Sequence, residues 1–183
     1  MSKKIFLVFV FVLFTALSFG QIYRCEGEGK SGPVTVSLHF VEYADYRYLL
    51  LIDGVSVFLD EENITRLQAV LEKFSTWESI AAEGQVTLTK TIDSITFASF
   101  HYSHTFFKEP VVFYFVFTGS TETAELDNPT RYFLFVDTTL DRILPFRLSS
   151  QTAAEFLEAL SPEKLAASWE SYRQQKALEA LFN

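Results

Sequence analysis

Over much of the chain, apolar residues occupy every second position and polar residues lie between them, a pattern typical of β-strands. Over residues 34–41 the alternation predicts a strand with one buried face and one hydrated face, and it places His39 on the hydrated face. Two further apolar runs, Tyr46–Ile52 and Val55–Leu59, flank the pair Asp53-Gly54. Because both residues of such a turn accept positive φ, the pair predicts a two-residue hairpin in which Ile52 faces Val55.

The spacing of apolar residues changes from two to three or four after this hairpin, which predicts a helix. Asp60 is the expected N-cap, Glu61 and Glu62 place negative charge in the first turn, and Gly84 is the expected stop. The expected inner stripe of this helix consists of Ile64, Leu67, Leu71, Phe74, Trp77, Ile80 and Ala81.

Strand patterns then return over residues 85–148. Asp93-Ser94 is expected to be a turn between two strands, and a loop is expected around residues 106–110. Residues 111–118 and 131–137 are apolar on both faces, which is typical of central strands or of a sheet that is covered twice. Pro145 makes the strand over residues 143–148 an expected edge or bulged strand.

Two helices are expected at the end of the chain. Ser149 caps the first of them, and Ser161 followed by Pro162 caps the second. The expected stripe of the last helix consists of Leu165, Trp169, Tyr172, Leu178 and Leu181.

These elements predict an α+β domain over residues 34–183, with a twisted antiparallel sheet of about 7–8 strands packed by one central helix and a C-terminal helix pair. Residues 57–71 and 146–160 both run from a strand through a polar cap into an amphipathic helix. The domain is therefore a candidate for a degenerate duplication of a meander-plus-helix unit. This order resembles the doubled sheet-plus-helix modules of the Whirly and Pur-alpha type, which bind nucleic acid through basic sheets that this acidic chain lacks.

The first 20 residues have the pattern of a secretory signal peptide. Lys3 and Lys4 precede an apolar run over residues 5–17, and Ser18-Phe19-Gly20 supplies small residues at the −3 and −1 positions of a cleavage site. The apolar run is shorter than the ~20 residues that a membrane span needs. We therefore expect export to the periplasm or the extracellular space, no membrane span after cleavage, and a flexible lead-in over residues 21–33; an uncleaved anchor is the alternative.

Charge narrows the expected partners. The formal net charge is −8, and removing residues 1–20, which hold two Lys and no acid, changes it to −10. Nucleic acids and anionic membrane surfaces bind basic patches, so neither is an expected partner. The one cysteine, Cys25, excludes an internal disulfide, and no His or Asn lies near it in sequence to activate the thiol.

Candidate chemistry is sparse. His101 and His104 would share a face only on a helix, so on a strand they are weak metal ligands that need a third partner such as Asp93 or Glu109. The chain has no G-x-S-x-G elbow and no phosphate-binding glycine loop. We therefore expect a protein that is not an enzyme and that uses no cofactor; a metal-dependent enzyme built on the two histidines is the less favoured alternative.

The aromatic strands favour a binding function. They could simply fill the core, line a pocket for a lipid or other apolar small molecule, or present a surface to a partner protein. The sequence thus indicates an exported, non-catalytic protein that binds a partner or ligand, with an apolar-ligand carrier as the alternative. The candidate binding residues are Tyr102, Phe113, Tyr114, Phe115, Phe133 and Phe135.

Overall fold

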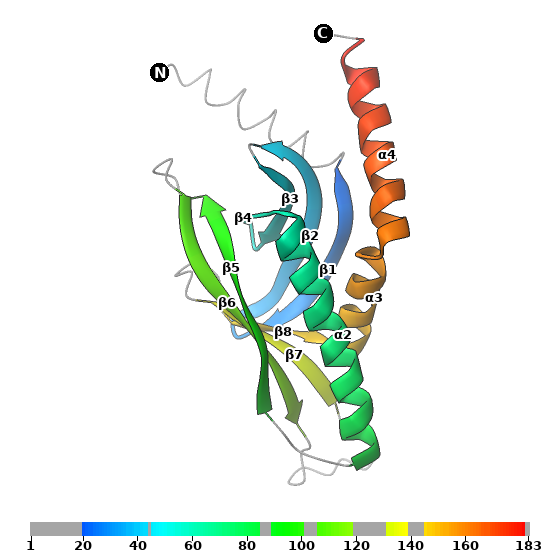
Figure 1. The fold of residues 1–183 in the computed structure, drawn as a ribbon. Coiled ribbons are helices and arrows are strands. Elements are labelled where there is room, and N and C mark those ends of the chain that lie inside the picture. The colour runs from blue at the N-terminus through cyan, green and yellow to red at the C-terminus, as the bar shows by residue number, and fades with distance from the viewer. Residues whose placement is uncertain are drawn as a thin grey trace.

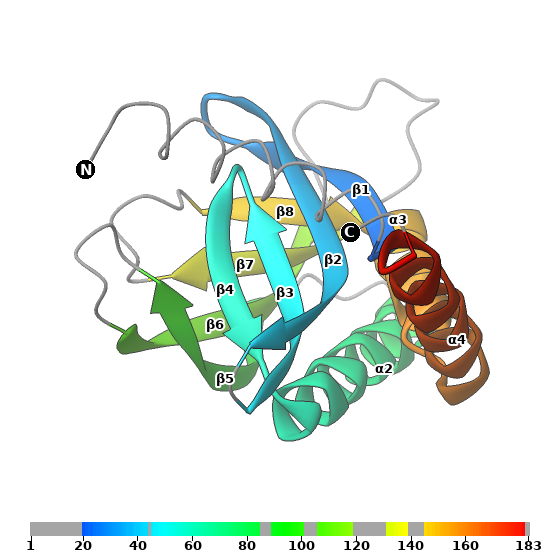
Figure 2. The ribbon, with the colours of Figure 1, turned by 90° about the horizontal axis from the view of Figure 1, so that it is seen from above.

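The structure, a computed structural model, describes residues 20–43, 45–84, 89–100, 106–118, 131–138 and 145–181. Within these ranges, eight antiparallel strands follow one another in chain order, and the last pairs with the first to close the curled sheet. The helices gather on one side of the strands (Figures 1 and 2). The predicted α+β class with an antiparallel sheet is confirmed. In chain order the elements are β1 (Gln21–Gly29), β2 (Gly32–Tyr43), β3 (Tyr46–Ile52), β4 (Val55–Leu59), α2 (Glu61–Gly84), β5 (Thr89–Phe100), β6 (Phe106–Thr118), β7 (Arg131–Thr138), β8 (Phe146–Ser149), α3 (Ser150–Ala159) and α4 (Pro162–Glu179).

The element order repeats. Four antiparallel strands, β1 to β4, lead into α2, and four more, β5 to β8, lead into α3. The two strand–cap–helix junctions that the sequence pairs with each other are the β4–α2 and β8–α3 junctions. The described part of the chain therefore has the order of two successive meander-plus-helix units.

The β3–β4 hairpin has the predicted register, with Ile52 opposite Val55 and Tyr48 opposite Leu59. Asp53 and Gly54 both have positive φ, 49° and 81°. The Asp53 carboxylate accepts a hydrogen bond of 3.1 Å from the Thr35 amide of β2. One turn residue therefore ties three neighbouring strands together.

The expectation of a flexible lead-in over residues 21–33 is corrected by the structure, because most of this segment forms β1. The outward residues of this strand are charged and exposed, which made the segment resemble a polar loop. Its inward residues pack: the Tyr23 ring stacks on Phe156 of α3 at 4.8 Å, and its hydroxyl donates a hydrogen bond to the Thr152 carbonyl. At Gly27 an added Cβ would lie 2.9 Å from Phe146 Cδ2.

The predicted turn at Asp93-Ser94 is also wrong, because β5 runs through it without reversing. The strand is irregular between Thr91 and Asp93, where its register against β6 shifts by one residue. Arg66 of α2 contacts both Asp93 carboxylate oxygens, at 2.9 and 2.8 Å, so the polar pair serves helix docking. Likewise, the expected loop at residues 106–110 belongs to β6, and the reversal between β5 and β6 lies outside the described residues.

One hydrophobic cluster joins the sheet to the helices. Its strand members lie on one face of the sheet, which we call the core face, and α2, α3 and α4 add Leu67, Phe156 and Tyr172 among others. The deepest side chains have 0 % exposure and come from both halves of the chain. They are Leu38, Val57, Leu59, Ile95, Leu134 and Leu160.

Three apolar residues of the expected helix stripes are outside this core. Ile80 of α2 is 61 % exposed. Leu178 and Leu181, which follow the buried Tyr172 near the end of the chain, are 59 % and 78 % exposed. His39 differs in the opposite sense, since it is buried although a hydrated position was expected, and its Nε2 lies 2.9 Å from Ser37 Oγ. Periodicity therefore identified the helices correctly but overestimated how far their apolar stripes are covered.

We expect Leu38→Ala to lower the free energy of unfolding by about 2–5 kcal/mol, because it leaves a cavity at a fully buried site. The matched control is Leu178→Ala, the same change at an exposed position, which should stay within about 0.5 kcal/mol of the parent. Urea unfolding followed by circular dichroism measures both. Equal losses in the two variants would contradict the described core.

Candidate binding site

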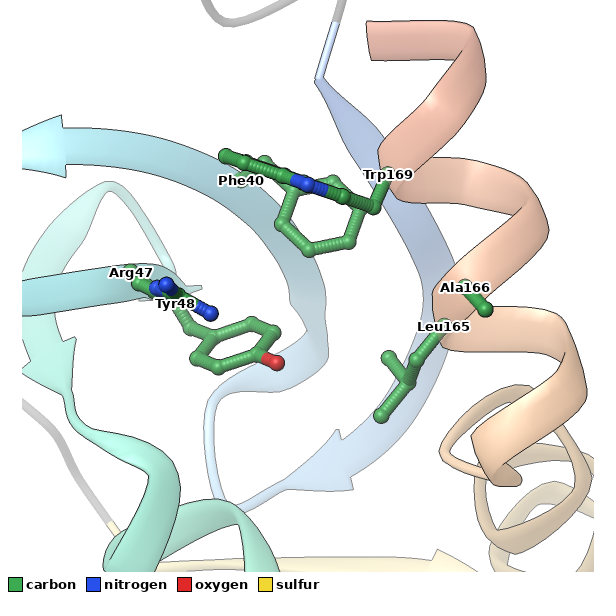
Figure 3. Close-up of a pocket in the computed structure, with 6 residues that line it drawn as sticks. All are labelled: Phe40, Arg47, Tyr48, Leu165, Ala166 and Trp169. Carbon is green, nitrogen blue, oxygen red and sulfur yellow. The ribbon is translucent and has the colours of Figure 1, made fainter. Parts of the chain in front are cut away.

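A cleft lies where α4 crosses β2 and β3. The Ser161 hydroxyl caps α4 by accepting from the Lys164 amide, and Pro162 occupies the first turn. From this start, Leu165 and Trp169 are one helical turn apart and face the two strands (Figure 3). The strands contribute Phe40 from β2 and Tyr48 from β3.

Aromatic rings form most of the cleft wall. The centres of the Phe40 and Tyr48 rings are 5.5 Å apart, and Trp169 meets Phe40 edge-on at 5.1 Å. The cleft has a volume of about 180 Å³ and is open to solvent on one side. The lining residues are Phe40, Arg47, Tyr48, Leu165, Ala166 and Trp169.

Charged groups stand at the rim. Arg47 lies 5.8 Å from the centre of the Trp169 ring and forms an ion pair of 3.1 Å with Glu61 at the start of α2. The Tyr48 hydroxyl donates to the same carboxylate at 3.2 Å. Because the Arg47 and Glu61 side chains are 62 % and 60 % exposed, this pair adds little stability and mainly orients the rim.

Among the residues that line the cleft, Tyr48 has a shifted pKa. Burial, together with the nearby Glu61 carboxylate, raises the pKa of its phenol to about 12. The hydroxyl is therefore a neutral hydrogen-bond donor at any physiological pH. A wall of rings with one hydroxyl fixed by Glu61 can hold an apolar group and orient one polar atom beside it.

Contacts beyond the cleft anchor α4 to β2. Tyr172 is buried and lies 5.8 Å from Phe40 between ring centres, while Trp169 lies 5.5 Å from Tyr172. Lys176 forms an ion pair with Glu42 near the end of β2, and this hydrogen bond raises the lysine pKa. The helix is thus held to β2 along the turns that follow Trp169.

The structure separates the aromatic residues that the sequence singled out. Phe113 is buried in the core cluster, where β6 register pairs it with Val136. Phe133 is also buried but lies outside that cluster, with the Arg147 guanidinium 4.4 Å from its ring centre. Phe135 is half-buried and shares the face of Phe133, since the two are separated by one residue of β7.

The remaining candidates are only partly described. Tyr114 and Phe115 belong to β6, paired with Phe135 and Leu134, but their side chains are outside the description. Tyr102, His101 and His104 lie outside the described residues altogether. Binding by this set, and metal binding by the two histidines, both stay predictions.

Sequence reasoning did not identify the cleft residues as a site. Each of the three aromatic residues, Phe40, Tyr48 and Trp169, fits a core position of its own strand or helix. The spacing of apolar residues within one element does not indicate which other element packs against it. The usable signal was local composition: an arginine stands beside Tyr48 in β3, and two large aromatic residues, Trp169 and Tyr172, are three positions apart in α4.

Other chemistry is limited in the described ranges. No group of three His, Cys, Asp or Glu residues there could hold a metal ion. Burial raises the pKa of the Cys25 thiol to about 11, which keeps it protonated and weakly nucleophilic at neutral pH. Among the helices that the structure describes, none has an apolar stretch long enough to cross a membrane.

Searches against protein-family profiles, curated proteins and solved structures found no match to this chain.

Stability should fall as pH rises from about 10 to about 12, in part through Tyr48. Its folded pKa, about 12, is above the ordinary value of 10.0, so its contribution is complete below pH 10 and is lost as pH rises through the folded value. Tyr48→Phe has no phenol to ionise and should show a shallower loss over this interval. Urea unfolding at several pH values measures the slopes, and parallel slopes for the two proteins would contradict the assignment.

Proposed function

We propose that this chain is an exported, non-catalytic binding protein, and that the cleft between α4 and the β2–β3 strands receives an apolar group of a partner protein. The observation that carries the proposal is the composition of the cleft: Phe40, Tyr48 and Trp169 form the wall and Arg47 the rim. Trp, Tyr and Arg are the residues most enriched among those that dominate binding energy at protein interfaces.

Size favours a side chain over a lipid. The cleft volume of about 180 Å³ is below the ~300–1,000 Å³ of pockets that enclose drug-sized ligands. It is close to the ~150 Å³ of an engineered cavity that accepts one benzene molecule. One aromatic or branched aliphatic side chain therefore matches the cleft better than an acyl chain does.

The polar rim supports the same choice. A partner segment that places an apolar side chain against Trp169 brings its backbone close to Arg47 and Tyr48. Arg47 has further N–H groups that can donate to backbone carbonyls, and the Tyr48 hydroxyl oxygen, whose proton is donated to Glu61, can accept from a backbone N–H. Both groups already contact Glu61, so they are oriented before any partner arrives. A lipid tail would use neither of these polar groups.

The signal-like segment over residues 1–20 supports export, and the acidic net charge of −8 disfavours nucleic acids and anionic membrane surfaces as partners. The carrier of a lipid or other apolar molecule is the alternative function. It would need a larger cavity, to which the strands apolar on both faces could contribute.

A photoreactive amino acid in place of Ala166 should crosslink the partner in the exported compartment, because Ala166 is exposed and lines the cleft. Ala167 is the matched control, since it is also exposed but follows Ala166 on the helix and does not line the cleft. Adding Trp169→Ala should remove the adduct seen at position 166. The measurement is the adduct mass on gels and by mass spectrometry.

Equal adducts at both positions, or no adduct at position 166, would contradict the proposed cleft. Native mass spectrometry of protein purified from the same compartment, followed by solvent extraction, tests the alternative. A stoichiometric apolar molecule in the extract would favour the carrier, and a mass equal to that of the chain alone would favour the partner.

A further inference from the structure

Two lysines from different elements converge on Trp77, far along α2 from the cleft. Lys73 precedes Trp77 by one helical turn, and Lys90 comes from the start of β5. Their ammonium nitrogens lie 4.9 and 4.7 Å from the centre of the indole ring. Two positive charges therefore border a single aromatic ring.

Within the described ranges, neither lysine forms an ion pair with a carboxylate. The ion pairs among the described residues use other cations, and the acid nearest in sequence to Lys90, Asp93, is contacted through both oxygens by Arg66. Lys73 donates one hydrogen bond, of 3.3 Å, to the Ile92 carbonyl, which leaves further ammonium donors for a ligand.

Each exposed cation–π contact contributes about 0.5–1 kcal/mol, so the ring helps to hold two like charges on one part of the surface. A dianion that contacts both ammonium groups would gain two favourable charge interactions at once. Lysine binds phosphate as a compact point charge with rotatable donors, whereas carboxylates are better matched by the planar fork of arginine.

We propose that Lys73, Lys90 and Trp77 form a binding site for a phosphate group. The two ammonium groups bind its oxygens, and the indole fixes the lysine stems so that the charges are positioned before the anion arrives. The site is separate from the aromatic cleft and takes a ligand of opposite character, so the chain has a second point of recognition.

Isothermal titration calorimetry with inorganic phosphate, at constant ionic strength set with chloride, tests the site. The parent protein should give a saturable heat, and Lys73→Gln or Lys90→Gln should weaken binding about tenfold or more, the equivalent of about 1.4 kcal/mol for the lost charge. Lys30→Gln, which removes an exposed lysine from the β1–β2 turn, is the control and should bind as the parent does.

Fluorescence gives an independent readout, because the chain has only two tryptophans. In a Trp169→Phe background the emission comes from Trp77 alone and should change with the same saturation curve. The proposal is overturned if phosphate gives no saturable signal, if chloride produces the same signal, or if the variant with both Lys73→Gln and Lys90→Gln retains parental affinity with its fold intact by circular dichroism.

Discussion

The fold depends on helices that cover the core where the sheet is weakest. Between β4 and β5 the described ladder consists of two residue pairs, and between β1 and β8 it again consists of two. Elsewhere the ladders are longer, so the closed sheet has two short seams. α2 packs beside β4 and β5, and α3 packs beside β1 and β8, which places apolar helix faces over both. Without them the core face would be open to water at these positions.

This constraint explains why the sequence allowed the class to be predicted but not the closure. Local signals were sufficient for the β3–β4 hairpin, the Asp60, Ser149 and Ser161 caps and the helix spans, since each depends on neighbouring residues. β1 was missed because its outward side chains are charged, and β5 was split because Asp93-Ser94 resembles a turn. In both segments the deciding contacts come from distant elements, namely Phe156 and Arg66.

The candidate site was harder to predict for the same reason. Phe40, Tyr48 and Trp169 are far apart in sequence, and each satisfies the apolar pattern of its own element, so no short motif distinguishes them from core residues. The aromatics that composition made conspicuous fall on different faces of the sheet, with Phe113 in the core and Phe133 outside it. The aromatic composition of a segment thus does not indicate which of its residues share a face or a site.

Gly27 has a consequence beyond its own position. A Cβ there would lie 2.9 Å from Phe146 Cδ2, 3.0 Å from the Arg147 carbonyl oxygen and 3.1 Å from Leu148 Cδ2, so a side chain would have to displace these groups and would weaken the pairing of β1 with β8. Separation at this short seam would convert a ring of strands into an open sheet with two edges. Unpaired strand edges are templates for pairing with other chains. By allowing this close approach, Gly27 lets the backbone groups of β1 and β8 pair with each other at the seam, where they are not available to another copy of the chain.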